Sequence, residues 1–128
     1  MEIDKMSPIQ KRQHYYFKGR SLAESGQTIE AIEVYKIYCT VLAKEDQHIP
    51  ELWLSKMYKE IGNEIESLKH LERYAIGCSD PKAAEVYKDC GDGYSNLGHV
   101  DKAVANYKLA LEKNPKSPVK SKLQSLQK

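Results

Sequence analysis

Residues 87–115, YKDCGDGYSNLGHVDKAVANYKLALEKNP, are the most regular part of a chain that repeats itself along its length. Gly26, Gly62 and Gly98 are spaced 36 residues apart, and small residues stand at fixed distances on both sides of each glycine. Seven positions earlier stand Gly19, Ser55 and Gly91, and five positions later stand Ala31, Ser67 and Ala103. Apolar residues three and four apart flank each turn, a spacing typical of amphipathic helices. The sequence therefore predicts helix pairs, each joined by a tight turn.

The third copy resembles a known repeat. Its pattern is Tyr87-x2-Cys90-Gly91-x2-Tyr94, then Ala103-x3-Tyr107, then Pro115. It resembles the tetratricopeptide repeat (TPR), W-x2-L-G-x2-Y…A-x3-F…P, and the likeness extends over roughly residues 12–117. In the second copy Glu51 stands where the others have Tyr15 and Tyr87. The resemblance implies an all-α fold, a right-handed superhelical α-solenoid of three TPR helix-turn-helix pairs with a C-terminal capping helix.

The expected organisation is a single domain over residues 1–128. The repeats are placed at roughly 12–47, 48–83 and 84–117, with the capping helix at 118–127. Helices are predicted at 8–25, 28–45, 50–61, 64–77, 81–97, 100–113 and 118–127. Asn63 with Glu66 predicts a capping box, and Asp80 is expected to cap the helix that Pro81 begins. Small residues of each pair, such as Gly91 and Ala103, are expected to face one another.

The cysteine pattern favours a reducing compartment, because the chain has three cysteines and no CxxC spacing. Cys39 and Cys90 are predicted to be buried, and Cys78 to be exposed. No apolar run reaches the roughly 18 residues that a membrane span needs, and the first residues lack the apolar core of a signal peptide. We therefore expect a cytoplasmic protein with no membrane contact.

The formal net charge is +2, but it is unevenly distributed. Residues 102–128 carry seven basic groups and one acidic group. In this stretch Val119, Leu123 and Leu126 recur at helical spacing, so an apolar stripe is expected to cover the last repeat while the lysines face solvent. A nucleic-acid partner is the weaker interpretation, because no RNA- or DNA-reading motif accompanies the charge.

No catalytic or cofactor-binding constellation can be assembled from the sequence. The four histidines have no metal-ligand spacing, and no phosphate-binding loop or nucleophile motif is present. His70, with Glu66 and Tyr74 on one helix face, is predicted to form surface pairs. We expect no enzymatic activity, no cofactor and no metal.

The TPR resemblance places a ligand groove on the first helix of each pair. Carried onto this chain, the main groove positions are Tyr16, Phe17, Arg20, Leu52, Trp53, Lys56, Lys59, Glu85, Lys88, Asp89 and Asp92. Family members that hold the C-terminal carboxylate of heat-shock chaperones use lysine, asparagine and arginine at matching positions. Here Glu85 and Asp89 would repel that carboxylate, so chaperone tails are not expected as partners.

The function predicted from these residues is that of a non-catalytic TPR adaptor or scaffold for protein–protein interaction. Aromatic residues with arginine are the usual anchors of binding hot spots, so a peptide with apolar anchors and asymmetric charge is the expected ligand. The alternative is a TPR-type secretion chaperone that cradles an unfolded client and dimerises. A structural alternative also stays open, in which Phe17 and Trp53 wedge between neighbouring helix pairs.

Overall fold

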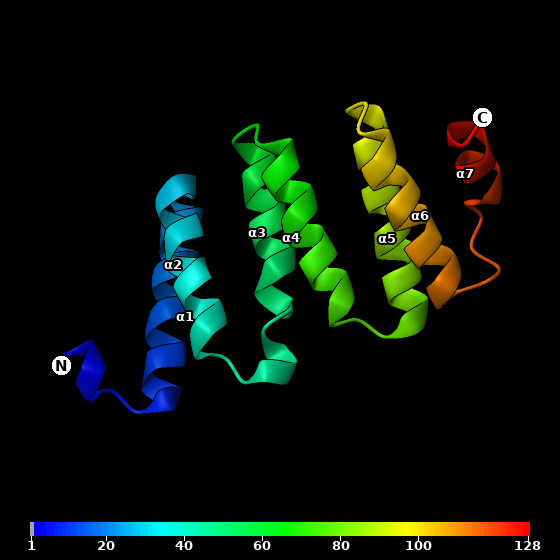
Figure 1. Ribbon diagram of the computed structural model, residues 1–128. Helices are drawn as coiled ribbons and strands as arrows, with labels where there is room; N and C mark the ends of the chain where they lie inside the picture. Colours follow the sequence, from blue (N-terminus) through cyan, green and yellow to red (C-terminus); the bar gives the residue numbers. More distant parts are fainter. Residues whose placement is uncertain (1) are drawn as a thin grey trace. The chain divides into compact units, whose positions relative to one another are not determined.

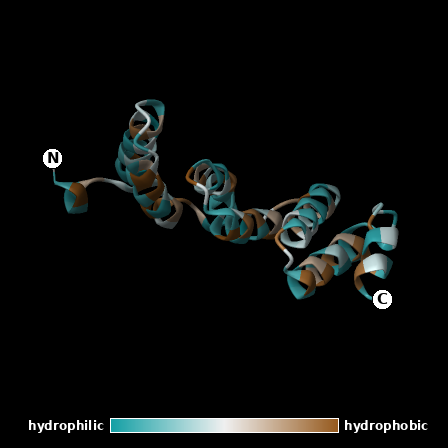
Figure 2. Cartoon of the chain, turned by 90° about the horizontal axis from the view of Figure 1, so that it is seen from above, coloured by the Kyte–Doolittle hydropathy of each residue, from teal (hydrophilic) through white to brown (hydrophobic). Residues whose placement is uncertain are grey.

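The computed structural model describes residues 2–128, and their regular secondary structure is helical (Figure 1). The helices are α1 (Pro8–Glu24), α2 (Thr28–Val41), α3 (Ile49–Glu60), α4 (Glu64–Ile76), α5 (Asp80–Asn96), α6 (Val100–Lys113) and α7 (Lys120–Leu126), with 3-10 turns η1 (Ile3–Lys5) and η2 (Lys44–Asp46). No residue in 2–128 lies in a strand, so the all-α prediction is confirmed. The helices carry both hydrophobic and hydrophilic residues (Figure 2).

The chain divides into two compact units, the first ending at His70 and the second beginning at Leu71. In the first unit α1 packs against α2, and α2 packs against α3. In the second, α5 and α6 form an antiparallel pair, and α7 packs against α6.

The three repeated glycines adopt the same turn. Gly26, Gly62 and Gly98 have φ angles of +80°, +82° and +80°, a region that residues with a Cβ rarely adopt. After each glycine, the next residue's N–H bonds at 2.9 Å to a carbonyl in the preceding helix; the acceptors belong to Leu22, Tyr58 and Tyr94. This is the hydrogen bond of a helix C-terminal cap. The 36-residue period is therefore present in the backbone.

The helix starts follow capping chemistry, with one correction. Ser7 and Gln10 form a reciprocal capping box at α1, and the Asn63 side chain accepts a 3.2 Å hydrogen bond from the Glu66 N–H at α4. Asp80, however, is the first residue of α5 and not its cap. Ser79 takes the extended N-cap conformation, with ψ at 156°, so the predicted cap was wrong by one position.

The second helix was predicted to reach residue 45, but α2 ends at Val41. Leu42 leaves the helix with ψ at 155°, and η2 follows it. The residues after Val41 therefore form the connection to α3 and do not lengthen α2.

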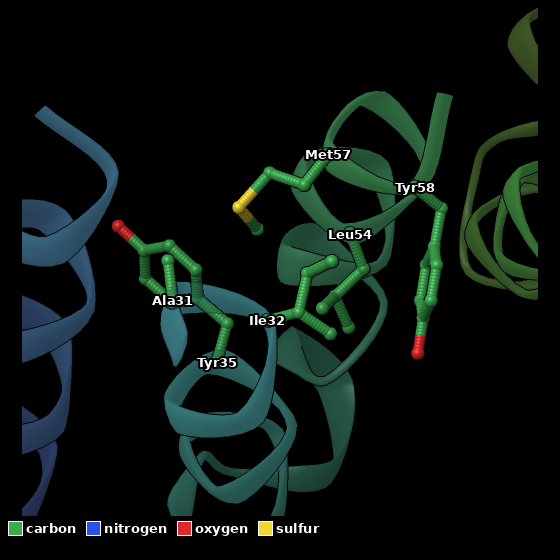
Figure 3. Close-up of a cluster of buried hydrophobic side chains, with 6 residues drawn as sticks. All are labelled: Ala31, Ile32, Tyr35, Leu54, Met57 and Tyr58. Atoms are coloured by element: carbon green, nitrogen blue, oxygen red, sulfur yellow. The ribbon is translucent and has the colours of Figure 1, made fainter. Parts of the chain in front are cut away.

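The core of the first unit lies between α2 and α3 (Figure 3). Its buried side chains are Ala31, Ile32 and Tyr35 from α2, and Leu54, Met57 and Tyr58 from α3. Ile32 points toward Leu54 across the contact, and Leu54 is fully buried. Burial of this kind supplies most of the stability of a helical domain.

The small residues allow close approach, but tyrosine rings fill the space next to them. A Cβ built on Gly19 would lie 2.7 Å from the ring of Tyr35, and one on Gly91 would lie 2.5 Å from the ring of Tyr107. In the second repeat, Ser55 and Ser67 form a buried hydrogen bond of 3.1 Å between their hydroxyl groups. The prediction that small residues face small residues is correct for this serine pair. It is wrong for Gly19 and Gly91, which pack against the rings of Tyr35 and Tyr107.

The prediction that His70 is a surface residue was wrong. His70 is 3% exposed, its ring stacks on Tyr58, and its Nδ1 lies 2.9 Å from Glu51 Oε2. The Cys39 thiol also donates to Glu51, at 3.7 Å. Glu51 therefore occupies the position of the aromatic residue in the other repeats, and its carboxylate is hydrogen-bonded to neighbouring groups.

The cysteines partly follow expectation. Cys90 is fully buried, and burial raises the pKa of its thiol well above the ordinary value. Cys39 is half-buried, not fully buried as predicted. Cys78 was predicted to be exposed but is also half-buried, and its thiol donates to the Tyr74 carbonyl at 3.3 Å.

In the second unit, polar side chains link α4, α5 and α6. The Tyr94 hydroxyl donates to Glu72 at 2.6 Å, and the Asn106 amide donates to the same carboxylate at 3.1 Å. The chain after α6 then covers α6. Val119 is fully buried and Leu123 and Leu126 are half-buried, as expected for an apolar stripe that packs on the preceding helix.

Candidate functional site

Five aromatic rings gather where α1, α2 and α3 meet in the first unit. This aromatic cluster consists of Tyr16, Phe17, Tyr35, Tyr38 and Trp53. Tyr16 lies 6.0 Å from Trp53, and Trp53 is stacked on Tyr38 with 9° between the ring planes. Burial raises the pKa of the Tyr35 and Tyr38 phenols. The cluster places predicted groove residues of α1 and α3 in mutual contact.

The two predicted aromatic anchors differ in their surroundings. Trp53 is half-buried and packs edge-to-face on Tyr35 at 5.4 Å, so it fills the contact between α2 and α3. Phe17 is 60% exposed, and its ring packs edge-to-face on Tyr16, with 5.2 Å between the ring centroids. The structural alternative therefore describes Trp53 and does not describe Phe17, which is accessible to a partner.

Exposed cations lie on α1 and α3, the helices that carry Phe17 and Trp53. Arg20 is exposed and binds Glu24 at 2.9 Å, and this hydrogen bond raises the pKa of the guanidinium, with a smaller effect from Tyr16. Lys56 and Lys59 are exposed on α3, and Leu52 is half-buried there. The accessible part of the predicted site in the first unit thus combines one aromatic ring with basic side chains.

The predicted positions of the second unit lie on α5. Glu85 is exposed and 3.7 Å from Lys82, Asp89 is exposed, and Lys88 is half-buried. Asp92 is engaged within the fold, because its carboxylate accepts hydrogen bonds from the Tyr107 hydroxyl at 2.5 Å and from Lys122 at 2.9 Å. Asp92 therefore joins α5 to α6 and α7.

The surroundings of Asp92 shift two pKa values in opposite directions. Burial raises the pKa of Asp92, but the hydrogen bonds from Tyr107 and Lys122, with the charges of Lys122 and Lys88, outweigh it and lower the pKa overall. Burial, and then the bond to Asp92, raises the pKa of Tyr107. Neutral Tyr107 and ionised Asp92 are therefore the stable pair.

A shallow pocket of about 640 Å³ opens on α1. It is lined by Met6, Gln10, Gln13, His14, Phe17 and Lys18. The His14 Nε2 atom is buried and has no hydrogen-bond partner. Of the residues that line this pocket, Phe17 is one of the main groove positions, and Gln13 lies on the same predicted groove face.

Several residues with a role at these surfaces were not predicted. Tyr38 lies three positions after the motif residue Tyr35, a helical spacing that could have indicated the cluster. No comparable signal exists for Met6 beside His14, or for Lys122 beside Asp92, because each contact joins separate elements.

Within residues 2–128, no group of three or more His, Cys, Asp or Glu side chains is placed to hold a metal ion. None of the helices described combines the length and hydrophobicity needed to cross a membrane. In comparisons with known proteins, no family model and no curated protein matches this chain.

Proposed function

We propose that the chain is a TPR α-solenoid that acts as a non-catalytic adaptor in the cytoplasm, binding a protein or peptide segment. The accessible edge of the aromatic cluster carries this proposal, because Phe17 is 60% exposed and because α1 and α3 also carry the exposed cations Arg20, Lys56 and Lys59. Exposed aromatic and arginine side chains are the common anchors of protein interfaces. The three identical glycine turns and the antiparallel helix pairs support the TPR assignment.

The ligand surface of the first unit is formed by Tyr16, Phe17, Arg20 and Lys56. Tyr16 is half-buried and supports Phe17, so the rigid cluster would hold the exposed ring in position without a large entropy cost on binding. Arg20 and Lys56 would bind acidic groups of the partner. The cytoplasmic location rests on the odd number of cysteines.

The dimerising chaperone is the second candidate. It is favoured by two exposed isoleucines: Ile29 is 63% exposed on α2, and Ile76 is 77% exposed on α4. Such side chains suit contact with an unfolded client. Concentration-dependent self-association in sedimentation experiments would favour this candidate over a monomeric adaptor.

Affinity capture from the native source with a matched pair of variants tests the adaptor proposal. Arg20→Ala removes an exposed groove cation, and Lys108→Ala removes an exposed lysine of α6 outside the predicted groove. A specific partner should be retained by the native chain and by Lys108→Ala, and should be lost or reduced about tenfold with Arg20→Ala. Equal capture by both variants would contradict the proposal.

A further inference from the structure

The pocket on α1 lies on a different helix face from the one that packs against α2. Gly19 turns toward Tyr35 of α2. His14 and Lys18 are about one helical turn apart, so they share a face of α1. At 100° per residue, His14 lies roughly 140° around the helix from Gly19. Apart from Met6, which precedes the helix, all residues lining the pocket belong to α1 itself. No other helix takes part in this surface.

The pocket combines apolar and polar groups that suit a ligand side chain. Phe17 and Met6 supply apolar walls, and an apolar anchor of a partner would bury surface against them. The His14 Nε2 atom is buried without a partner, which is uncommon for a polar atom in a folded protein. Because Nε2 is covered, a carboxylate beside the anchor could accept a hydrogen bond from an Nε2–H group only after the surrounding side chains move.

The positive charge of α1 indicates that its partner is negatively charged. The helix contains Lys11, Arg12, Lys18 and Arg20 against a single acidic residue, Glu24, which is paired with Arg20. Among residues 2–128, no carboxylate lies within 4.0 Å of the side-chain nitrogens of Lys11, Arg12 or Lys18. An acidic partner would neutralise these charges, whereas a second copy of α1 would add like charges.

We propose that this α1 pocket is a second docking site, which adjoins the groove at Phe17, and that it binds an acidic peptide segment through one apolar anchor. The anchor enters between Met6 and Phe17, and carboxylates of the segment bind Lys18 and His14. The segment follows the helix from Gln10 to Lys18, a length of about 13 Å.

To test this proposal, random peptides of about 12 residues are displayed on phage and selected for binding to the full chain. A peptide of this length covers the surface from Gln10 to Lys18 in an extended or a helical form. Enriched peptides should be acidic and share one large apolar residue. Affinity should fall about tenfold or more with Lys18→Glu, and also with His14→Leu, which keeps an apolar side chain in place of the ring. Lys108→Glu is the matched charge control and should change affinity less than about twofold.

Several results would overturn the proposal. They are no enriched peptide, enriched peptides that are basic or uncharged, or acidic peptides that bind Lys18→Glu as well as the native chain. Loss of peptide binding with Arg20→Ala but not with Lys18→Glu would place the peptides in the groove and refute only the second site. Concentration-dependent dimers that Lys18→Glu abolishes would assign the pocket to a second copy. Binding to phosphatidylserine-containing vesicles that depends on Lys18, without peptide binding, would assign it to a membrane surface.

Discussion

Replacing Gly91 by alanine tests the packing of the most regular repeat. A Cβ at this position would lie 2.5 Å and 2.6 Å from two carbons of the Tyr107 ring, where ordinary contact is about 3.5–4.0 Å. The ring would have to move by about 1 Å. It is 2% exposed and its hydroxyl is bonded to Asp92, so it has little room to move.

The expected net effect of Gly91→Ala is a loss of about 1–2 kcal/mol in the free energy of unfolding. Overpacking of a well-packed core costs about 1–3 kcal/mol. Against this, alanine is better than glycine in a helix interior by roughly 0.5–1 kcal/mol, because glycine loses more backbone entropy on folding. The steric cost is the larger of the two, so the sign is destabilising.

Urea unfolding followed by the helical dichroism signal measures this change. A double-mutant cycle with Tyr107→Leu provides the control, because leucine removes the ring atoms that the new methyl group would meet. Alanine at Gly91 should cost less in the Tyr107→Leu background, or even stabilise it. If Gly91→Ala alone left stability unchanged or raised it, the close contact between α5 and the Tyr107 ring would be refuted.

Three further outcomes are expected. Trp53→Ala should lower the unfolding free energy by about 2–3 kcal/mol, because the ring packs inside the aromatic cluster, whereas Phe17→Ala should stay within about 0.5 kcal/mol; equal losses in thermal melts would contradict the different burial of these rings. Removing residues 117–128 should cost about 2 kcal/mol or more and promote self-association measured by sedimentation, since Val119 is fully buried; a stable monomer would show that α7 does not cover α6. The folded pKa of Asp92 is lowered, so its contribution to stability is present above the unfolded carboxyl pKa and is lost as the pH falls through the folded value. Asp92→Asn should flatten this part of an acid titration of unfolding, and an unchanged acid limb would argue against the hydrogen bonds to Asp92.

The helix pairs could be predicted because their signals are local. A turn that requires a positive φ selects glycine whatever lies around it, so Gly26, Gly62 and Gly98 mark the turns directly. Apolar periodicity likewise shows which face of a helix is buried. The end of α2 was predicted less well, because Leu42 is as good a helix former as its neighbours and only its connection to α3 takes it out of the helix.

The partners of polar side chains could not be predicted in the same way. Spacing assigns a residue to a face, but it does not show which distant residue lies opposite. Glu51 appeared as a departure from the TPR pattern, and only the fold places it against His70. The same holds for Asp92, which was predicted to face a ligand and is bonded to Lys122, 30 positions later in the chain.

The first and last helix pairs are covered to different extents. After α6, the chain buries Val119 completely and packs α7 on the pair. Before α1, the short turn η1 has no buried residue, and Met6 contributes only one wall of a shallow pocket that leaves Phe17 largely exposed. Repeat domains need polar or covered terminal faces to stay soluble. Here the unpaired cations of α1 would give the open face that solubility, and they would also select acidic partners over a second copy of the chain.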